Sequence, residues 1–323
     1  MNALPALPLS ANEAADGAAG LRLFPAPARF RPVVLLLSVV LGIAALAAGA
    51  VVASAGMTVQ AGPFVRFLFL AAAMFALSAW CRVRHLDPRL GDAAAIVGVG
   101  ILALMACGVV SNAGLRLGAS PVDGLLAGID GLVGIDVAQV VRAFAAQPAT
   151  IDALAVIYNA SGAIAVALIG LRLLANRRAE AWELVMTIVL AMQVVALVSI
   201  VAPAVGAMAH LAMLDLQGAG LPAGAGIYHL EAFHHFRAGT DTVLRLDDMS
   251  GLVTFPSFHT VLALVALQAV ARTRLRWLGV AWAAAVIVST IPIGGHYVID
   301  LVAGFAIWAG AVTVARRVST PSA

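Results

Sequence analysis

Lysine is absent from this chain of 323 residues, and charged residues of any kind are scarce. Its positive charge comes from arginine alone, and charged residues make up 11% of the sequence, against about 25% in an average soluble domain. Hydrophobic residues make up 63%, and the mean hydropathy is +1.02. This composition excludes an ordinary soluble domain. It predicts an all-α, polytopic membrane protein, because helices satisfy their own backbone hydrogen bonds within a bilayer.

Cysteine and aromatic residues are also few. Cys81 and Cys107 are the two cysteines, placed at a predicted helix end and in mid-membrane, so no disulfide framework is expected. The formal net charge of +3 does not come from a basic patch with interleaved aromatic residues. We therefore expect no nucleic-acid partner, and we interpret the arginines as signals of membrane topology.

Eight apolar runs predict membrane-spanning helices, for which a bilayer needs about 20 residues each. They lie at 33–53, 64–81, 93–112, 151–171, 183–203, 255–271, 276–292 and 297–315. If the spans alternate in direction, fourteen of the nineteen arginines fall on one side of the membrane. By the positive-inside rule that side is cytoplasmic, with both termini. The lysine-free, alanine-rich composition suggests a GC-rich bacterium, so we expect an inner-membrane protein whose opposite face meets the periplasm.

Composition divides the chain into five segments. We expect a disordered cytoplasmic tail at 1–32, N-terminal transmembrane helices at 33–112, an outward loop with an interfacial helix at 113–150, a membrane core at 151–317 and a tail at 318–323. In the outward loop, Asp136, Gln139 and Arg142 share one helical face, with apolar residues largely opposite. A second outward stretch, 204–254, is long for a compact protein, and we expect it to cap the functional site.

Two short polar stretches interrupt the apolar C-terminal half, at 255–260 and 289–300. His296 and Asp300 are four residues apart, so on a helix they share one face. An aspartate that accepts from one ring nitrogen fixes the tautomer and raises the basicity of the other nitrogen, which is how a histidine becomes a nucleophile. Pro256 and the pair Gly294-Gly295 interrupt the helices and free backbone N–H groups that can face an anion.

These stretches resemble the second and third signature motifs, PSGH and SRxxxxxHxxxD, of the type-2 phosphatidate phosphatase superfamily. Ser289, His296 and Asp300 keep the spacing of the third motif, whereas Phe258 stands for the glycine of PSGH and Thr290 for the arginine of the third motif. The first motif, KxxxxxxRP, is absent. The forms FPSFHT and GGHYxxDxxAG are more similar to the branch that contains inositol phosphorylceramide synthase. Sphingomyelin synthases share the arrangement of two histidines and one aspartate more distantly. The match covers 255–304, with looser matches at Asp123–Tyr158 and Phe233–Gly239.

The resemblance implies roles for three catalytic residues in a core at 151–317. His296 is expected to form a phosphohistidine, Asp300 to orient it, and His259 to protonate the leaving alcohol as a general acid. The family chemistry requires no cofactor and no metal. A metal site at His229, His234 and His235 is the alternative for those residues, but adjacent histidines in a loop without a well-spaced carboxylate are more often not ligands.

A phosphate-binding group must replace the missing arginine, because developing charge on a phosphoryl group has to be neutralised. Arg237 lies in a segment similar to an Arg-x-Gly of the branch and is the candidate, whereas Arg245, beside two aspartates, is interpreted as a solvated charge. Ser257 and Gly295 are the further candidates. Ser257 can equally be a helix cap, and Gly295 can allow close approach of the backbone to phosphate.

Other polar residues leave two interpretations open. Asp123, Asp130 and Asp136 either bind an acceptor head group or are solvated loop acids, and Tyr158 either lines a polar cavity or hydrogen-bonds between helices.

The expected function is a membrane lipid phosphotransferase. Its donor would be a phospholipid or lipid phosphate, and its acceptor an alcohol or lipid hydroxyl. A lipid phosphate phosphatase would use the same residues with water as acceptor. A transporter or flippase that binds phospholipid without chemistry is an alternative of another class, which broken helices at a midplane site would favour.

Overall fold

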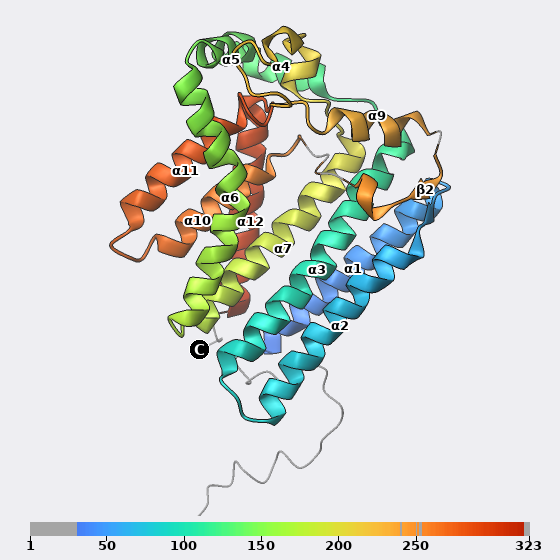
Figure 1. Cartoon of the computed structure of the whole chain (residues 1–323), viewed down its shortest axis with the longest axis vertical. Coiled ribbons are helices and arrows are strands. Elements are labelled where there is room, and N and C mark those ends of the chain that lie inside the picture. The colour runs from blue at the N-terminus through green and yellow to red at the C-terminus, as the bar shows by residue number, and fades with distance from the viewer. Residues whose placement is uncertain (1–30, 240, 250, 252–253, 320–323) are drawn as a thin grey trace, which may run out of the picture.

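The computed structural model describes residues 31–239, 241–249, 251 and 254–319. Long helices run roughly side by side, and shorter ones gather at one end (Figure 1). The elements are α1 (Arg31–Ser54), β1 (Thr58–Val59), α2 (Ala61–Val83), α3 (Pro88–Gly114), η3 (Leu115–Leu117), α4 (Asp123–Leu132), α5 (Val137–Ala145), α6 (Pro148–Leu174), α7 (Arg178–Val201), α8 (Ala207–His210), η4 (Leu214–Leu216), α9 (Leu230–Ala238), β2 (Val243–Leu244), η5 (Leu246–Asp248), α10 (Phe258–Val270), α11 (Arg276–Thr290) and α12 (Val298–Ser319).

A helix is present at each of the eight predicted spans, which confirms the prediction of an all-α polytopic membrane protein. Among the described residues, six helices are long and apolar enough to cross a membrane: α1, α2, α3, α6, α7 and α12. The other two, α10 and α11, have 13 and 15 residues. At about 1.5 Å per residue they are about 20 and 22 Å long, less than the hydrocarbon core of about 30 Å. Pro256 delays the start of α10, and α11 ends shortly before Pro292.

The membrane bundle has α7 near its centre. Apolar side chains of α7 such as Met186 and Val189 are buried against α1, α3, α10 and α12. Many apolar side chains on the outer helices are exposed, including Leu46, Phe69 and Trp277. Because such a surface is stable only in an apolar solvent, the protein is an integral membrane protein.

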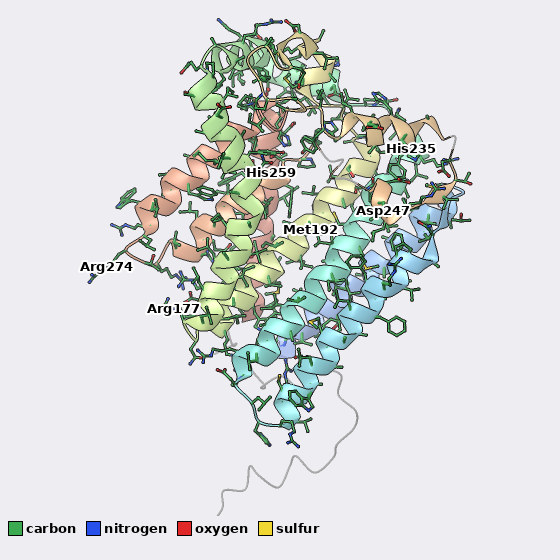
Figure 2. All side chains as sticks on the ribbon, viewed as in Figure 1. Arg177, Met192, His235, Asp247, His259 and Arg274 are labelled. Carbon is green, nitrogen blue, oxygen red and sulfur yellow. The ribbon has the colours of Figure 1, made fainter. Side chains whose placement is uncertain are left out.

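The arginine-rich connections gather at one end of the bundle, and the short helices cover the other, which we call the capped end (Figure 1). Arg177 lies at the arginine-rich end in Figure 2, and His259 lies inside the bundle toward the capped end. This separation agrees with alternating spans, although the side that faces the cytoplasm stays a prediction. The tails predicted at 1–32 and 318–323 fall almost entirely outside the described residues.

The capped end is built from the two stretches that the sequence singled out as outward loops. Helices α4 and α5 meet at a bend of 87°, and one side of α5, with Val137 and Val141, packs on Ile151 and Leu154 of α6. The helix predicted around Asp136–Arg142 is therefore present, and its position on a membrane surface stays a prediction. The second stretch carries α8 and α9, and its strand β2 pairs in parallel with β1.

Two buried aspartates connect α4 to the rest of the capped end. Asp130 accepts from the backbone N–H groups of Val298 and Ile299, with N–O distances of 2.7 and 2.9 Å, and so caps α12. Asp123 accepts from the N–H groups of Val205 and Gly206, both at 2.9 Å. The interpretation of these two residues as solvated loop acids is wrong, because both are 2% exposed. Asp136 is exposed and caps α5.

Replacing Asp130 by alanine removes both charge-assisted hydrogen bonds to α12. We expect a loss of about 2 kcal/mol in the free energy of unfolding, seen as a lower thermal midpoint in detergent. Asp152→Ala is the matched control, because Asp152 is exposed on α6. Equal midpoints for the two variants would contradict the capping role.

Candidate active site

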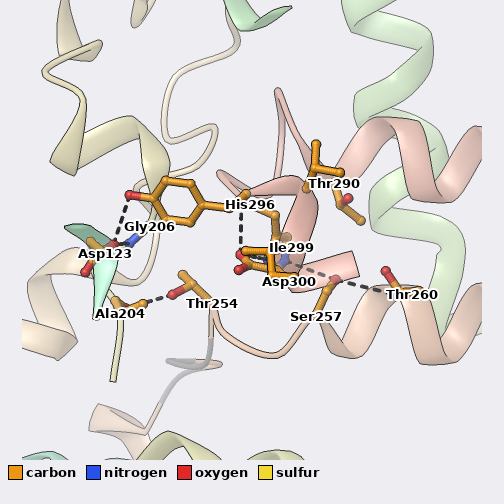
Figure 3. Close-up of polar contacts among 12 residues, drawn as sticks. Asp123, Ala204, Gly206, Thr254, Ser257, Thr260, Thr290, His296, Ile299 and Asp300 are labelled. Carbon is orange, nitrogen blue, oxygen red and sulfur yellow. Dashed lines mark hydrogen bonds and ion pairs between the residues drawn. The ribbon is translucent and has the colours of Figure 1, made fainter. Parts of the chain in front are cut away.

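The site centres on a buried contact between His296 and Asp300. Nδ1 of His296 lies 3.1 Å from Oδ2 of Asp300, and the same oxygen accepts from the backbone N–H of Tyr297 at 3.0 Å. Figure 3 shows the two residues close together, with His296 in the turn before α12 and Asp300 in its first turn. The carboxylate only accepts, so Nδ1 carries the proton and Nε2 keeps its lone pair. The contact predicted from the spacing of four residues is present, but the two residues do not share one helix as expected, because His296 lies in the turn before α12 and Asp300 in its first turn.

Glycines set the position of the His296 backbone. Gly295 has a φ of +72°, and a Cβ atom there would lie 2.7 Å from the carbonyl oxygen of Gly226. At Gly294 a Cβ atom would lie 2.6 Å from the Thr290 oxygen and 2.8 Å from Cδ2 of His296. Both positions thus require glycine, and the chain can reverse direction between α11 and α12. The backbone that approaches Gly295 closely is that of Gly226, in the second outward stretch, 204–254, which we call the capping stretch.

Ser257 joins the start of α10 to the His296 ring. Its Oγ accepts from the N–H of Thr260 as an N-cap and lies 3.4 Å from Nε2 of His296. Its own N–H donates to the carbonyl oxygen of Asp300 at 3.1 Å. Gly304 allows α12 to approach the start of α10 this closely, since a Cβ atom on Gly304 would lie 2.4 Å from the backbone carbonyl oxygen of Ser257. Ser257 is therefore a cap that also faces the nitrogen expected to attack.

His259 lies on the first turn of α10 and stacks on an aromatic ring of α6. The ring centroids of His259 and Tyr158 are 3.9 Å apart, at an interplanar angle of 20°. The Tyr158 hydroxyl is 3.0 Å from that of Tyr228, which is 50% exposed. Tyr158 thus packs against His259, and Tyr228 connects it to the surface. The place of Tyr158 in a polar cavity stays a prediction. The sequence carried no signal for Tyr228, because its pairing depends on where the capping stretch folds.

A third histidine, His229, lies beside the site, and sequence reasoning missed its role. It is fully buried, and its Nε2 lies 2.9 Å from the carbonyl oxygen of Val205. Because a carbonyl oxygen only accepts, Nε2 carries the proton, and Nδ1 has no hydrogen-bond partner among the described residues. Gly206 lies close to both this ring and the turn that carries His296. A Cβ atom built on Gly206 would lie 3.7 Å from Cε1 of His229 and 3.1 Å from the carbonyl oxygen of Gly295, so the His229 ring is next to that turn.

The candidate phosphate-binding arginine lies on α9. Arg237 donates to the carbonyl oxygen of Ala119 at 2.8 Å, and no described contact joins it to His259 or His296. Its role in phosphate binding stays a prediction. Arg245 forms ion pairs with Asp241 and Asp248, as expected of a loop charge.

The third motif has Thr290 in place of its arginine, and the hydroxyl groups at its start donate to carbonyl oxygens of their own helix, α11. Ser289 Oγ donates to the oxygen of Val286 and Thr290 Oγ1 to that of Ile287, each at 2.6 Å. The N–H of Gly295 donates to Ile291 at 3.2 Å, so a phosphate contact from this residue stays a prediction.

The electrostatic setting favours a neutral His296. Burial lowers the pKa of this imidazole, while a hydrogen bond with the Thr254 backbone acts in the opposite direction. Two further polar atoms, Oγ1 of Thr260 and Oδ1 of Asp300, are buried without a hydrogen-bond partner in the part of the chain that the structure describes. Unsatisfied buried polar atoms are costly, so their concentration here makes this place a candidate site for a polar ligand. Among the described residues, no group of three or more metal-ligating side chains is arranged to hold an ion.

Burial lowers the pKa of His229 from 6.5 to about 4. Between these values the unfolded chain binds a proton that the folded chain does not, so stability falls as the pH drops through this window. We expect the thermal midpoint of the unmodified chain to fall more steeply from pH 6.5 to 4 than that of His229→Gln. His210→Gln, at an exposed site, should follow the unmodified chain. Parallel profiles for all three proteins would contradict the assignment.

Comparison with known proteins adds one finding to this geometry. A family model described as the PAP2 superfamily, that is, the type-2 phosphatidate phosphatase superfamily, matches residues 125–314. This region is more than half of the chain and runs from α4 into α12. No curated protein and no solved structure matches. The matched region contains His259, His296 and Asp300. The chain therefore belongs to the PAP2 superfamily, whose members are phosphatases or phosphotransferases acting on phosphoesters.

Proposed function

We propose that this protein is a lipid phosphotransferase that works through a phosphohistidine on His296. The observation that carries the proposal is the contact of His296 Nδ1 with the buried carboxylate of Asp300, which leaves Nε2 facing Ser257 and the first turn of α10. A neutral imidazole held by a carboxylate is a competent nucleophile. Membership of the PAP2 superfamily supports phosphoester chemistry.

In the first step, Nε2 of His296 attacks the phosphorus of a lipid phosphoester. A P–N bond forms while the P–O bond to the leaving alcohol breaks, and His259 transfers a proton to the leaving oxygen. A bound anionic phosphate favours the protonated form of a neighbouring imidazole, so substrate binding prepares His259 for this role. Stacking on Tyr158 holds the His259 ring in place.

In the second step, an acceptor hydroxyl loses its proton to His259 and attacks the phosphorus. A new P–O bond forms, the P–N bond breaks, and both histidines return to their starting states. Asp300 stabilises the charge that His296 carries as the phosphohistidine forms and breaks down. The same sequence with water as acceptor releases phosphate, which is the phosphatase alternative.

Neutralisation of the phosphate has to come from groups other than the family arginine, because Thr290 occupies its position. The N-terminus of α10 offers backbone N–H groups and the positive end of its dipole. The hydroxyl of Ser257 and the unpartnered hydroxyl of Thr260 lie on the same turn. Arg237 is the candidate cation, and it would have to exchange its contact with Ala119 for the substrate.

The acceptor is proposed to be an alcohol or lipid hydroxyl rather than water. The segments FPSFHT and GGHYxxDxxAG are similar to the inositol phosphorylceramide synthase branch, which transfers head groups to ceramide. A bacterial inner membrane, with the site on the periplasmic side, is the proposed setting. Transport without chemistry finds less support, because the two histidines and the aspartate converge at one end of the bundle rather than at a midplane break.

The test uses detergent-purified protein with EDTA and a panel of phospholipids and lipid phosphates. Phosphate release and new head-group esters are measured with and without inositol, glycerol and ceramide. We expect a new phosphodiester that requires both donor and acceptor, and we expect His296→Ala to abolish it while remaining folded. Phosphate release that is indifferent to the acceptor would establish the phosphatase instead. Full activity in folded His296→Ala would contradict the proposed mechanism.

The role of Arg237 can be separated from that of a surface charge. We expect Arg237→Gln to reduce kcat/KM by about tenfold or more, because a charged hydrogen bond to the phosphoryl group is lost. Arg245→Gln is the matched control, since Arg245 is paired with two aspartates in the same loop. Equal kinetics for the two variants would assign charge neutralisation to the α10 N-terminus alone.

A further inference from the structure

A groove separate from the histidine site lies among the N-terminal helices. It has a volume of about 230 Å³ and is lined by residues of α1, α2, α3 and α7, nearly all of them apolar. Helices α1 and α2 both pack on α3, and the groove runs between these elements. Cavities of about 150 Å³ with apolar walls bind molecules the size of benzene, so this volume is sufficient for part of an acyl chain.

One charged side chain lines this otherwise apolar groove. Arg82 is near the C-terminal end of α2, at the arginine-rich end of the bundle, and its NH1 is buried without a hydrogen-bond partner among the residues that the structure describes. Its NH2 lies 3.8 Å from Oδ1 of Asp92, beyond hydrogen-bond length, and Arg178 makes the closer ion pair with Asp92. A buried guanidinium nitrogen without an acceptor is costly. Since NH1 has almost no accessible surface in this conformation, an anionic oxygen in the groove would satisfy it once the side chain turns toward the groove.

The order of the lining residues along α2 matches the shape of a lipid. Phe75 lies two turns nearer the middle of the helix than Arg82, about 10 Å away along the axis. Leu41 and Leu102 line the same apolar part, and Trp182 of α7 is a further wall. Ser38, on the outer helix α1, is exposed at the rim, so the groove opens toward the surrounding bilayer. The charged end is thus at the membrane boundary and the apolar end points inward.

We propose that this groove binds one anionic phospholipid, with its acyl chain against Phe75 and Trp182 and its phosphate on Arg82. The charge of Arg82 selects the anionic head group, and the apolar walls select the chain. Such a lipid belongs to the leaflet opposite the histidine site and bridges α1, α2 and α7. It is neither donor nor acceptor in the proposed reaction.

Bromine quenching of Trp182 tests the site directly. The full chain with Trp182 as its single tryptophan is placed in nanodiscs of phosphatidylcholine that contain a small fraction of brominated phosphatidylglycerol. We expect strong quenching by this lipid and weak quenching by brominated phosphatidylcholine at the same fraction. Arg82→Gln should raise the fraction of phosphatidylglycerol needed for half-quenching by about tenfold. Ser38→Phe should reduce quenching with Arg82 intact.

The control is Arg89→Gln, because Arg89 belongs to the same end of the bundle but pairs with Asp87 outside the groove. Equal quenching by the two lipids, or an equal effect of Arg82→Gln and Arg89→Gln, would overturn the proposal and indicate bulk lipid. Absence of quenching by either lipid would indicate that protein occupies the groove, such as another segment or a second copy. Native mass spectrometry of the unmodified chain gives an independent measurement, with one retained phosphatidylglycerol expected and none in Arg82→Gln.

Discussion

Buried carboxylates that accept backbone N–H groups hold the capped end together. Asp130 binds the first N–H groups of α12, Asp123 binds the turn before α8, and Asp300 binds both Tyr297 and the His296 ring. A carboxylate out of water is tolerated only when such donors surround it. The phenol of Tyr297 donates to Asp123 at 3.2 Å, so the turn that carries His296 is attached to α4 and, through Asp123, to Val205 and Gly206 before α8.

This arrangement explains which parts of the molecule the sequence could predict. Long apolar runs mark α1 to α3, α6, α7 and α12, because burial in lipid requires continuous hydrophobicity. The spacing of His296 and Asp300 predicts their contact, although it forms because the Asp300 side chain reaches back from the first turn of α12 to the preceding turn. Local chemistry also indicates Ser257 as a cap, since serine commonly precedes a helix.

Features that depend on contacts between distant segments could not be predicted in the same way. His229 becomes part of the site only because Gly226 and Gly295 allow two backbones to approach each other. Asp123 and Asp130 resemble solvated acids in a loop until α4 folds over the start of α12. Likewise, the sequence shows that an arginine is missing at Thr290, but not that Arg237 rests on Ala119 rather than on the histidines.

The short hairpin of α10 and α11 has a consequence for the lipid around it. A pair of helices about 20 and 22 Å long beside a hydrocarbon core of about 30 Å creates a hydrophobic mismatch, which a bilayer relieves by thinning. The phosphates of the neighbouring leaflet then descend toward the level at which α10 begins. In the proposed reaction, a lipid next to the hairpin would therefore need less vertical displacement to bring its phosphoester to His259 and His296. In this way the length of two helices would contribute to substrate access in the proposed reaction without any side chain that binds substrate.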